Sequence, residues 1–192
     1  LRRDAVEIAV AQAADITGVP KIREGDQVQI GNHRIRLVGV DAPAVDQLCL
    51  NTQGERWTCG AAARDELSKR FGSQSWTCQT RAVADRRGRT LARCEAGGED
   101  VQKWLAANGW ALAYPRSSRD YEADEKAARE AKAGMWQGAF IAPWDWRARN
   151  KKTTILGAAK PPENASTILL ASASGSVAPS PDCTIKGNVN RS

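Results

Sequence analysis

The chain has 192 residues, of which 42% are hydrophobic and 26% are charged, as is ordinary for one globular domain with flanking segments. It contains no run of about 18 apolar residues, so the sequence predicts no membrane-spanning helix. The formal net charge of +6 suits a phosphate-bearing partner, but residues 151–192 hold five basic and two acidic side chains and so carry half of this excess.

The first fifteen residues are expected to precede the folded domain. Residues 11–13, Ala-Gln-Ala, have the small-x-small form of a signal-peptidase site. The stretch before them contains Asp4 and Glu7 and lacks the long apolar core of an export signal. Residues 1–15 are therefore interpreted either as a residual signal segment or as a disordered leader.

Two alternating apolar runs follow this leader. Residues 16–30 lead into Gly31-Asn32, a dipeptide suited to a two-residue hairpin turn, and residues 35–40 return as the second strand. The next stretch, residues 38–49, reads "VGVDAPAVDQLC". It predicts an acidic, cysteine-bearing loop.

Three later segments have helical patterns. In residues 60–71, apolar side chains recur at i, i+4 and i+8, which places them on one helical face. Residues 99–109 predict a short helix that ends at Asn-Gly. Residues 119–134 place glutamates four residues before basic side chains, a stabilising spacing, and Gly134 supplies the stop.

The five cysteines have no C-x-x-C spacing, and the chain has a single histidine, so a structural zinc site is not predicted. Cys78 and Cys94 lie in two strand-like runs joined by a polar turn, and Cys49 and Cys59 bracket a short polar loop. We expect the disulfides Cys49–Cys59 and Cys78–Cys94, with Cys183 left over. The alternative is a set of buried free thiols in a cytosolic protein.

Five arginines fall within thirteen residues: Arg81, Arg86, Arg87, Arg89 and Arg93. The guanidinium group presents forked donors that match a phosphate, so the cluster suits phosphate binding better than lysines would. A solvated strand face and turn would show the same pattern.

The element pattern predicts an α+β protein built around a small β-barrel. Short strands, a helix between the third and fourth strands, and helices after the fifth strand fit a five-stranded OB-type barrel, a fold that binds oligonucleotides on its outer face. From about residue 150 the chain becomes rich in Ala, Ser and Pro, which predicts a flexible tail over residues 150–192. The final "CTIKGNVNRS" is more strand-like and is interpreted as the start of a truncated module.

Six stretches between residues 16 and 147 resemble the staphylococcal nuclease, or thermonuclease, family in order and spacing. They are "EGDQVQI", "RIRLVGVDAP", "CGAAARDEL", "DRRGRTLARC", "WLAANGWALAY" and "AGMWQGAFIAPWDWR". The likeness is greatest to the cysteine-bearing, exported bacterial branch. It implies that residues 16–149 form an OB-fold barrel of five strands with three α-helices. It also implies a secreted or periplasmic phosphodiesterase that depends on Ca²⁺ and cleaves DNA and RNA to leave a 3′-phosphate. We expect the protein to act as a monomer and without a membrane partner.

The resemblance assigns site residues. Asp26 and Asp41 match the calcium-binding carboxylates, and the carbonyl of Ala42 is a further oxygen ligand, as a hard cation prefers. Arg36 and Arg89 match the two catalytic phosphate-binding arginines. Forked guanidinium donors can bind two oxygens of a phosphodiester as negative charge develops on them. Taken one by one, the same acids could be turn residues and the same arginines surface residues.

One position departs from the family pattern. The family places a glutamate directly after the proline, as the general base or as the group that positions the attacking water, and here that position is Ala44. Asp46 lies two residues later and is the candidate replacement, although a solvated loop acid would look the same. Arg87 stands where the family usually has an aromatic residue, and with Tyr114 it is assigned to substrate binding.

Two functions from different classes remain open. The first is a calcium-dependent nuclease, slowed by the loss of a positioned base, which typically contributes about 10² to 10⁴ in rate. The second is a nuclease-like nucleic-acid-binding module that has lost catalysis. Retention of both carboxylates and both arginines favours the nuclease.

Overall fold

The structure is a computed structural model that describes residues 15–171. The sequence predictions for residues 1–14, for Cys183 and for the C-terminal "CTIKGN" motif lie outside these residues. Within the described part, no helix has the length and apolar character needed to cross a bilayer.

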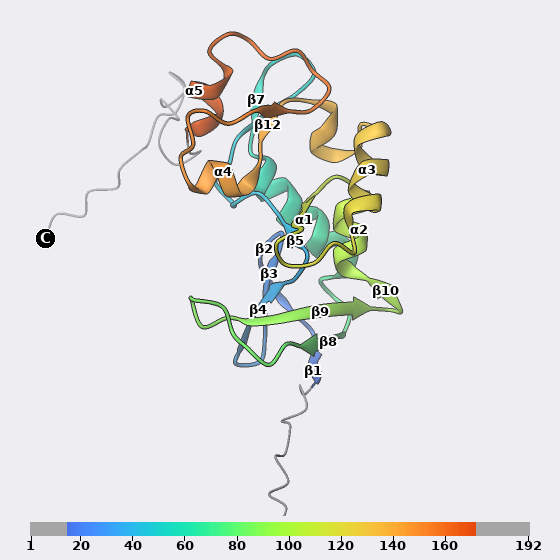
Figure 1. The fold of residues 1–192 in the computed structure, drawn as a ribbon. Coiled ribbons are helices and arrows are strands. Elements are labelled where there is room, and N and C mark those ends of the chain that lie inside the picture. Colours follow the sequence, from blue (N-terminus) through green and yellow to red (C-terminus); the bar gives the residue numbers. More distant parts are fainter. Residues whose placement is uncertain (1–14, 172–192) are drawn as a thin grey trace, which may run out of the picture.

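A curled sheet of seven strands forms the lower half of the molecule in Figure 1. Its strands run in the order β1-β8-β9-β4-β3-β2, and β10 pairs with β9. All pairs are antiparallel except β4 with β9, which is parallel. The strands are β1 (Asp15–Gly18), β2 (Lys21–Glu24), β3 (Gln27–Ile30), β4 (His33–Leu37), β8 (Trp76–Thr80), β9 (Thr90–Ala96) and β10 (Glu99–Asp100).

Short strands outside this sheet join distant parts of the chain in pairs. They are β5 (Val40–Asp41) with β11 (Leu112–Ala113), β6 (Cys49–Leu50) with β7 (Arg56–Trp57), and β12 (Phe140–Ile141) with β13 (Ile155–Leu156). Each strand has two residues, too few to show a period in sequence. The prediction of five strands is too low for residues 15–171, because the curled sheet alone has seven strands and the two-residue pairs, which arise from tertiary contact, add six more.

The helices also outnumber the prediction of three. The three predicted segments correspond to α1 (Cys59–Phe71), α2 (Val101–Ala107) and α3 (Glu122–Glu130). A single-turn 3₁₀ helix, η1, and two short α-helices follow: η1 (Gly134–Gln137), α4 (Pro143–Arg147) and α5 (Ala165–Leu170). Helices this short depend on packing rather than on an intrinsic periodic pattern.

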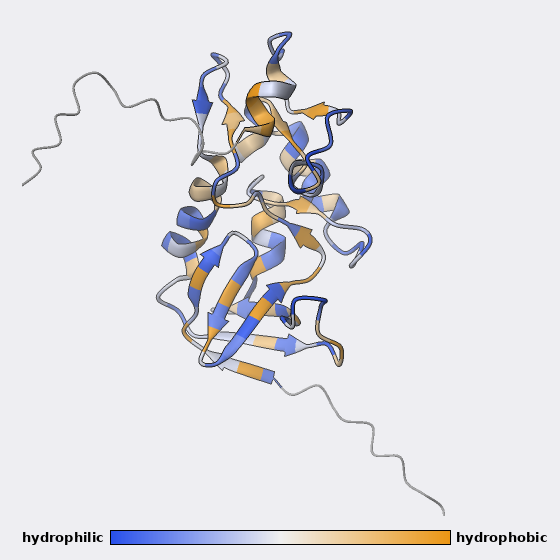
Figure 2. Ribbon diagram, turned by 90° about the vertical axis from the view of Figure 1, so that its left-hand side faces the viewer, coloured by the Kyte–Doolittle hydropathy of each residue, from blue (hydrophilic) through white to orange (hydrophobic). Residues whose placement is uncertain are grey.

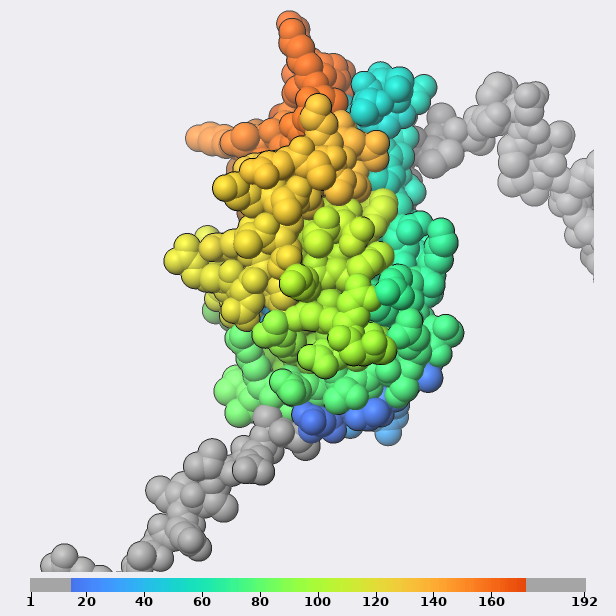
Figure 3. Space-filling view, turned by 90° about the vertical axis from the view of Figure 1, so that its right-hand side faces the viewer, coloured from blue at the N-terminus to red at the C-terminus, as the bar shows by residue number. Residues whose placement is uncertain are grey.

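The main core lies between the sheet and helices α1 and α2. It contains alternate residues of the strands, such as Val28, Ile30 and Ile35, together with Leu67 and Leu105 from the two helices. Figure 2 shows the corresponding alternation of hydrophobic and hydrophilic residues along the strands. In Figure 3 the side chains of α2 fill the middle of one face, between those of α3 and those of α1.

The turn and disulfide predictions are confirmed. Ile30 pairs with His33 across the two-residue turn, and Gly31 has a φ of 56°, which favours glycine. The disulfide Cys49–Cys59 closes the polar loop. Cys78–Cys94 joins two residues that face each other directly in the β8–β9 pair.

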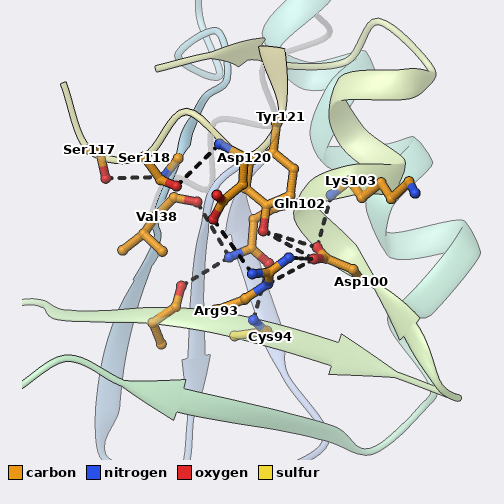
Figure 4. A network of polar contacts seen from close by, with 12 residues as sticks. Val38, Arg93, Cys94, Asp100, Gln102, Lys103, Ser117, Ser118, Asp120 and Tyr121 are labelled. Carbon is orange, nitrogen blue, oxygen red and sulfur yellow. Dashed lines mark hydrogen bonds and ion pairs between the residues drawn. The ribbon is translucent and has the colours of Figure 1, made fainter. Parts of the chain in front are cut away.

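A buried glutamine ties α2 to the sheet, as Figure 4 shows. Gln102 has no exposed surface. Its Nε2 donates to the carbonyls of Ala92 (3.0 Å) and Val38 (3.5 Å), and its Oε1 accepts the N–H of Cys94 (3.1 Å). These bonds satisfy backbone groups that would otherwise be buried without partners.

Asp100 extends this network to α3. Its carboxylate caps α2 by accepting the N–H of Lys103, and it also accepts from Arg93 and from the hydroxyl of Tyr121 (Figure 4). Arg93 reaches Asp120 as well. Arg93 thus has a structural role in this network.

Residues 150–171 differ from the predicted flexible tail. This segment, orange in Figure 3, lies at the end of the molecule opposite β1. Its strand β13 pairs with β12, and Ala165 and Leu169 of α5 are fully buried against Leu50, Ile141 and Trp146. Composition missed this, because an Ala-rich and Pro-rich segment can pack where a neighbouring apolar surface receives it.

Candidate functional site

Asp26 occupies the tight turn between β2 and β3 and has no exposed surface. Its Oδ2 accepts the N–H of Ala42 at 2.6 Å, which fixes the "VDAP" loop beside the turn. Gly25 permits this approach, because a Cβ there would lie 2.7 Å from Cβ of Ala42 and 3.3 Å from Cβ of Ala63. The sequence "EGD" therefore places a carboxylate under the loop.

Asp41 ends β5 and pairs with Leu112 of β11, which leaves it 2% exposed. Arg36 of β4 bridges the two acids. Its Nη2 contacts Asp41 Oδ1 at 2.6 Å, and its Nη1 forms an ion pair with Asp26 Oδ1. The fold thus gathers three of the residues predicted for the site from three separate strands and turns.

A second arginine, which the sequence analysis did not assign, joins this cluster. Arg147 is the last residue of α4, and its Nη2 forms an ion pair with Asp41 Oδ1. Its Nη1 donates to the carbonyl of Ala42 at 3.3 Å. Nothing in the local sequence separates Arg147 from Arg149, so only the fold reveals the contact.

Burial and charge act in opposite directions on these groups. Burial raises the pKa of Asp41, and the neighbouring charge of Asp26 raises it further, whereas Arg36 and Arg147 lower it. Burial alone would lower the pKa of Arg36, but the two carboxylates more than offset that effect and raise it above its ordinary value. Arg36 is therefore a permanently charged link between the two acids.

Asp85 organises the turn that carries the other arginines. Its Oδ1 accepts the backbone N–H groups of Arg87 and Arg89, each at 2.9 Å, and its Oδ2 accepts from Nε of Arg89 at 2.7 Å. Burial would raise the pKa of Asp85, but the hydrogen bonds from Arg89 and Arg87 outweigh it, and the pKa is lowered. Gly88, with a φ of 68°, completes the turn.

Two clefts of about 520 Å³ and about 430 Å³ open over this arrangement. Both are lined by the same four arginines: Arg36, Arg87, Arg89 and Arg147. The first cleft is also lined by Asp41, Tyr114 and Trp144, whose two rings lie 5.7 Å apart, and by Asp85. Because they share these four arginines, the two clefts form one continuous cationic surface. Acidic side chains border this surface, with Asp41 and Asp85 in the first cleft and Glu24 in the second.

The predicted site residues fall into three groups. Arg36, Arg87, Arg89, Tyr114 and Asp41 line the clefts. Asp26 and Ala42 are buried beside Asp41. Asp46, the candidate base, is half-buried in its loop and lines neither cleft.

Glu24 is a cleft residue that the sequence analysis missed. It lines the second cleft together with Ala44, Gln27 and Trp146, and its Oε2 accepts from Nε2 of Gln27. Burial raises the pKa of Glu24, and the charge of Asp26 adds to the effect. The one feature of the sequence that could have pointed to Glu24 is the motif "EGD", which places an acid two residues before Asp26.

The oxygens expected to hold calcium are already in contact with N–H groups. Asp26 accepts from Ala42 and pairs with Arg36, while Asp41 Oδ1 and the Ala42 carbonyl face Arg147. Two carboxylates and a carbonyl suit a hard cation, but among residues 15–171 no group of three or more acidic, histidine or cysteine side chains is arranged to hold a metal. Asp41 Oδ1 is contacted by Arg36 as well as by Arg147, so both arginines hold oxygens that the expected cation would use.

Comparison with known proteins identifies the class. The family profile described as "Staphylococcal nuclease homologue" matches residues 34–138, more than half of the chain. The chain belongs to this family, in which nuclease hydrolases are usual, and the membership implies an OB-fold. The matched residues include Arg36, Asp41 and Arg89, whereas Asp26 and Arg147 lie outside them.

A particular relative is the succinoglycan biosynthesis protein ExoI of Rhizobium meliloti (strain 1021). The two chains are 31% identical over 127 residues. The alignment covers 65% of this chain and 66% of ExoI, so it spans slightly less than two thirds of that protein.

Proposed function

We propose that this protein is a calcium-dependent phosphodiesterase that cleaves DNA and RNA internally. The observation that carries the proposal is the meeting of four arginines and a buried pair of carboxylates at two joined clefts. Membership of a nuclease-like family supports it. A polyanionic strand suits this surface, because arginine forks bind phosphate oxygens and the clefts are open to solvent.

The arginines would bind and orient the scissile phosphate. A guanidinium has five N–H donors, so Arg36 keeps donors for a phosphate while it bridges the two acids. Asp85 engages the Nε and Nη2 side of Arg89 and so fixes the direction of that group. Both arginines then face charge that develops on the phosphoryl oxygens in the transition state.

Asp26, Asp41 and the Ala42 carbonyl would hold the cation. When bound there, calcium would neutralise phosphoryl charge and polarise a water molecule. Tyr114 and Trp144 present aromatic surface beside the first cleft, where a nucleotide base or sugar can pack. Arg87, exposed on the rim, adds a contact to the strand.

Proton acceptance is the weak step of this site. Ala44 offers no acceptor, and Asp46 lines neither cleft, whereas Glu24 lines the same cleft as Ala44. We therefore propose slow hydrolysis, with Glu24 better placed than Asp46 to receive the proton of the attacking water. Loss of cleavage in Glu24→Gln but not in Asp46→Asn would support this assignment.

The test of the main proposal is a cleavage assay. Single-stranded DNA and RNA are incubated with the protein and calcium, with a chelator as one control and Asp41→Ala as another. We expect cleavage that both controls abolish. Cleavage that survives both would point to a contaminating enzyme and remove the support for the proposal. Salt-sensitive binding without any cleavage would favour the second function, a nuclease-like nucleic-acid-binding module.

We further propose that the protein acts as a monomer outside the reducing cytosol, in the periplasm or after secretion. The two disulfides support an oxidising compartment. Fractionation of cells that express the protein, followed by thiol counting, tests this proposal. Recovery in the cytosol with four reduced thiols at these positions would contradict it.

A further inference from the structure

The fork of Arg147 lies on two oxygens from adjacent residues. Nη2 pairs with Asp41 Oδ1, and Nη1 donates to the Ala42 carbonyl at 3.3 Å. These are two of the oxygens that the proposed cation site would use. A bidentate guanidinium is a cation of matching geometry for such a pair of acceptors.

The local charge is already balanced without a metal. Asp26 and Asp41 are neutralised by Arg36 and Arg147, which contact them directly. A divalent cation added to this group would leave an excess of two positive charges, of which Glu24, whose charge also acts on Asp26, Arg36 and Arg147, offsets at most one. Movement of one of the two arginines away from the acids would relieve this repulsion when a cation binds.

Arg147 is the arginine that can move. Arg36 is 14% exposed, is part of a central strand and contacts both acids. Arg147 is 31% exposed, lies at the end of a five-residue helix and lines both clefts, so space for its side chain lies beside it. The helix itself is held, because Trp146 is buried against α5.

We propose that Arg147 is a resident counter-ion of the cation site. It contacts two of the proposed ligand oxygens in the metal-free protein, the Ala42 carbonyl and Asp41 Oδ1, the second of which it shares with Arg36. It competes with calcium for these two oxygens and swings into the cationic clefts when calcium binds. There it can contact the phosphate of the bound strand. This inference rests on the cation site of the proposed function and adds a competitor that the family resemblance does not supply.

The experiment measures calcium binding directly by isothermal titration calorimetry on the full chain, without nucleic acid. Arg147→Gln should bind calcium at least about tenfold more tightly than the unaltered protein, since it removes one positive charge within contact distance of the ligands. Arg149→Gln is the charge-matched control. It lies two residues away, contacts the ring of Trp146 and the carbonyl of Leu170, and should change the affinity less than about twofold.

The outcomes separate the two proposals. If Arg147→Gln binds calcium no more tightly than the unaltered protein, while Asp41→Ala binds none, the site exists but Arg147 does not compete, and the inference is wrong. If neither the unaltered protein nor Arg147→Gln binds calcium at millimolar concentration, both the cation site and the inference fail. If Arg147→Gln and Arg149→Gln gain calcium affinity equally, the effect comes from the overall charge of the protein, and the inference is again wrong.

A second measurement needs no variant, in case Arg147→Gln folds poorly. The unaltered protein is treated with phenylglyoxal, which modifies accessible guanidinium groups, and the modified arginines are identified by mass spectrometry. Saturating calcium should increase modification of Arg147 severalfold and leave that of Arg149 unchanged. Unchanged modification of Arg147 in protein that has bound calcium would contradict the inference.

Discussion

Ala44 shows how one residue can limit a site that is otherwise assembled. It lines the second cleft with Glu24, Arg87 and Arg89 and is partly exposed. Ala44 also packs against the apolar core that contains Leu50 and Trp146. Its carbonyl is closely packed, since a Cβ on Gly60 would lie 1.6 Å from it. Substitution at this position would place a larger side chain at the wall of the second cleft.

We expect Ala44→Glu to raise the cleavage rate about tenfold to hundredfold. The new carboxylate would accept a proton beside the arginines, and positioned bases typically contribute about 10² to 10⁴ in rate. Single-turnover cleavage of a labelled oligonucleotide measures the change. Ala44→Gln, of equal size but without a basic carboxylate, should show no gain, and an equal gain in both variants would argue against proton acceptance.

At the scale of elements, the turn between β8 and β9 positions two of the four cleft arginines. Asp85 holds this turn through three hydrogen bonds to Arg87 and Arg89. Because these bonds favour the ionised carboxylate, the pKa of Asp85 is lower in the folded protein than its ordinary value of 3.8. Its contribution to stability is therefore present above about pH 4 and is lost as the pH falls through the lower folded-state pKa.

Asp85→Asn should therefore lower the free energy of unfolding by on the order of 1–2 kcal/mol at pH 7, since it removes the charge from these hydrogen bonds. The difference from the unaltered protein should shrink as the pH falls below about 4. Urea denaturation between about pH 2.5 and about pH 7 measures this difference in the free energy of unfolding. Glu130→Gln, an exposed acid on α3, is the control and should have little effect at any pH. A difference independent of pH would contradict the argument.

At the scale of the whole molecule, the segment after α4 completes the fold behind the site. Residues 155–170 add β13 and α5 to an apolar core, separate from the main core, that includes Leu50, Ile141 and Trp146. Trp146 directly precedes Arg147, so this core sets the position from which Arg147 reaches Asp41. The C-terminal segment is thus linked to the site through Trp146 and Ala44, which both line the second cleft and belong to or pack against this core.

Leu169→Ala should destabilise the protein by about 2–5 kcal/mol, the usual cost of removing a fully buried leucine side chain. Chemical denaturation gives the free energy of unfolding. Thr167→Ala, on the exposed side of the same helix, should stay within about 0.5 kcal/mol of the unaltered protein. If Leu169→Ala is equally silent, α5 does not pack as described.

Local signals in the sequence predicted the parts that depend on neighbouring residues. The Gly31-Asn32 turn, the helix at residues 60–71 and the Cys78–Cys94 pairing follow from turn chemistry and periodicity, and the structure confirms them. Ordered motifs also identified Asp26, Asp41 and Arg36, which the fold then brings together. These residues can be recognised in the sequence because each of them belongs to a short motif that lies within one element or turn.

Tertiary structure decided what depends on contacts between distant residues. The ion pair between Arg147 and Asp41 joins positions 106 residues apart, and the α5 core unites four segments of the chain. Glu24 rather than Asp46 lines the cleft with Ala44, although Asp46 is nearer in sequence. The sequence by itself determined the family, the main elements and the principal charged residues. Only the fold decided which charged side chains form ion pairs, because the partners lie far apart in the sequence. A periodic pattern indicates only the face of a helix or strand on which each residue lies.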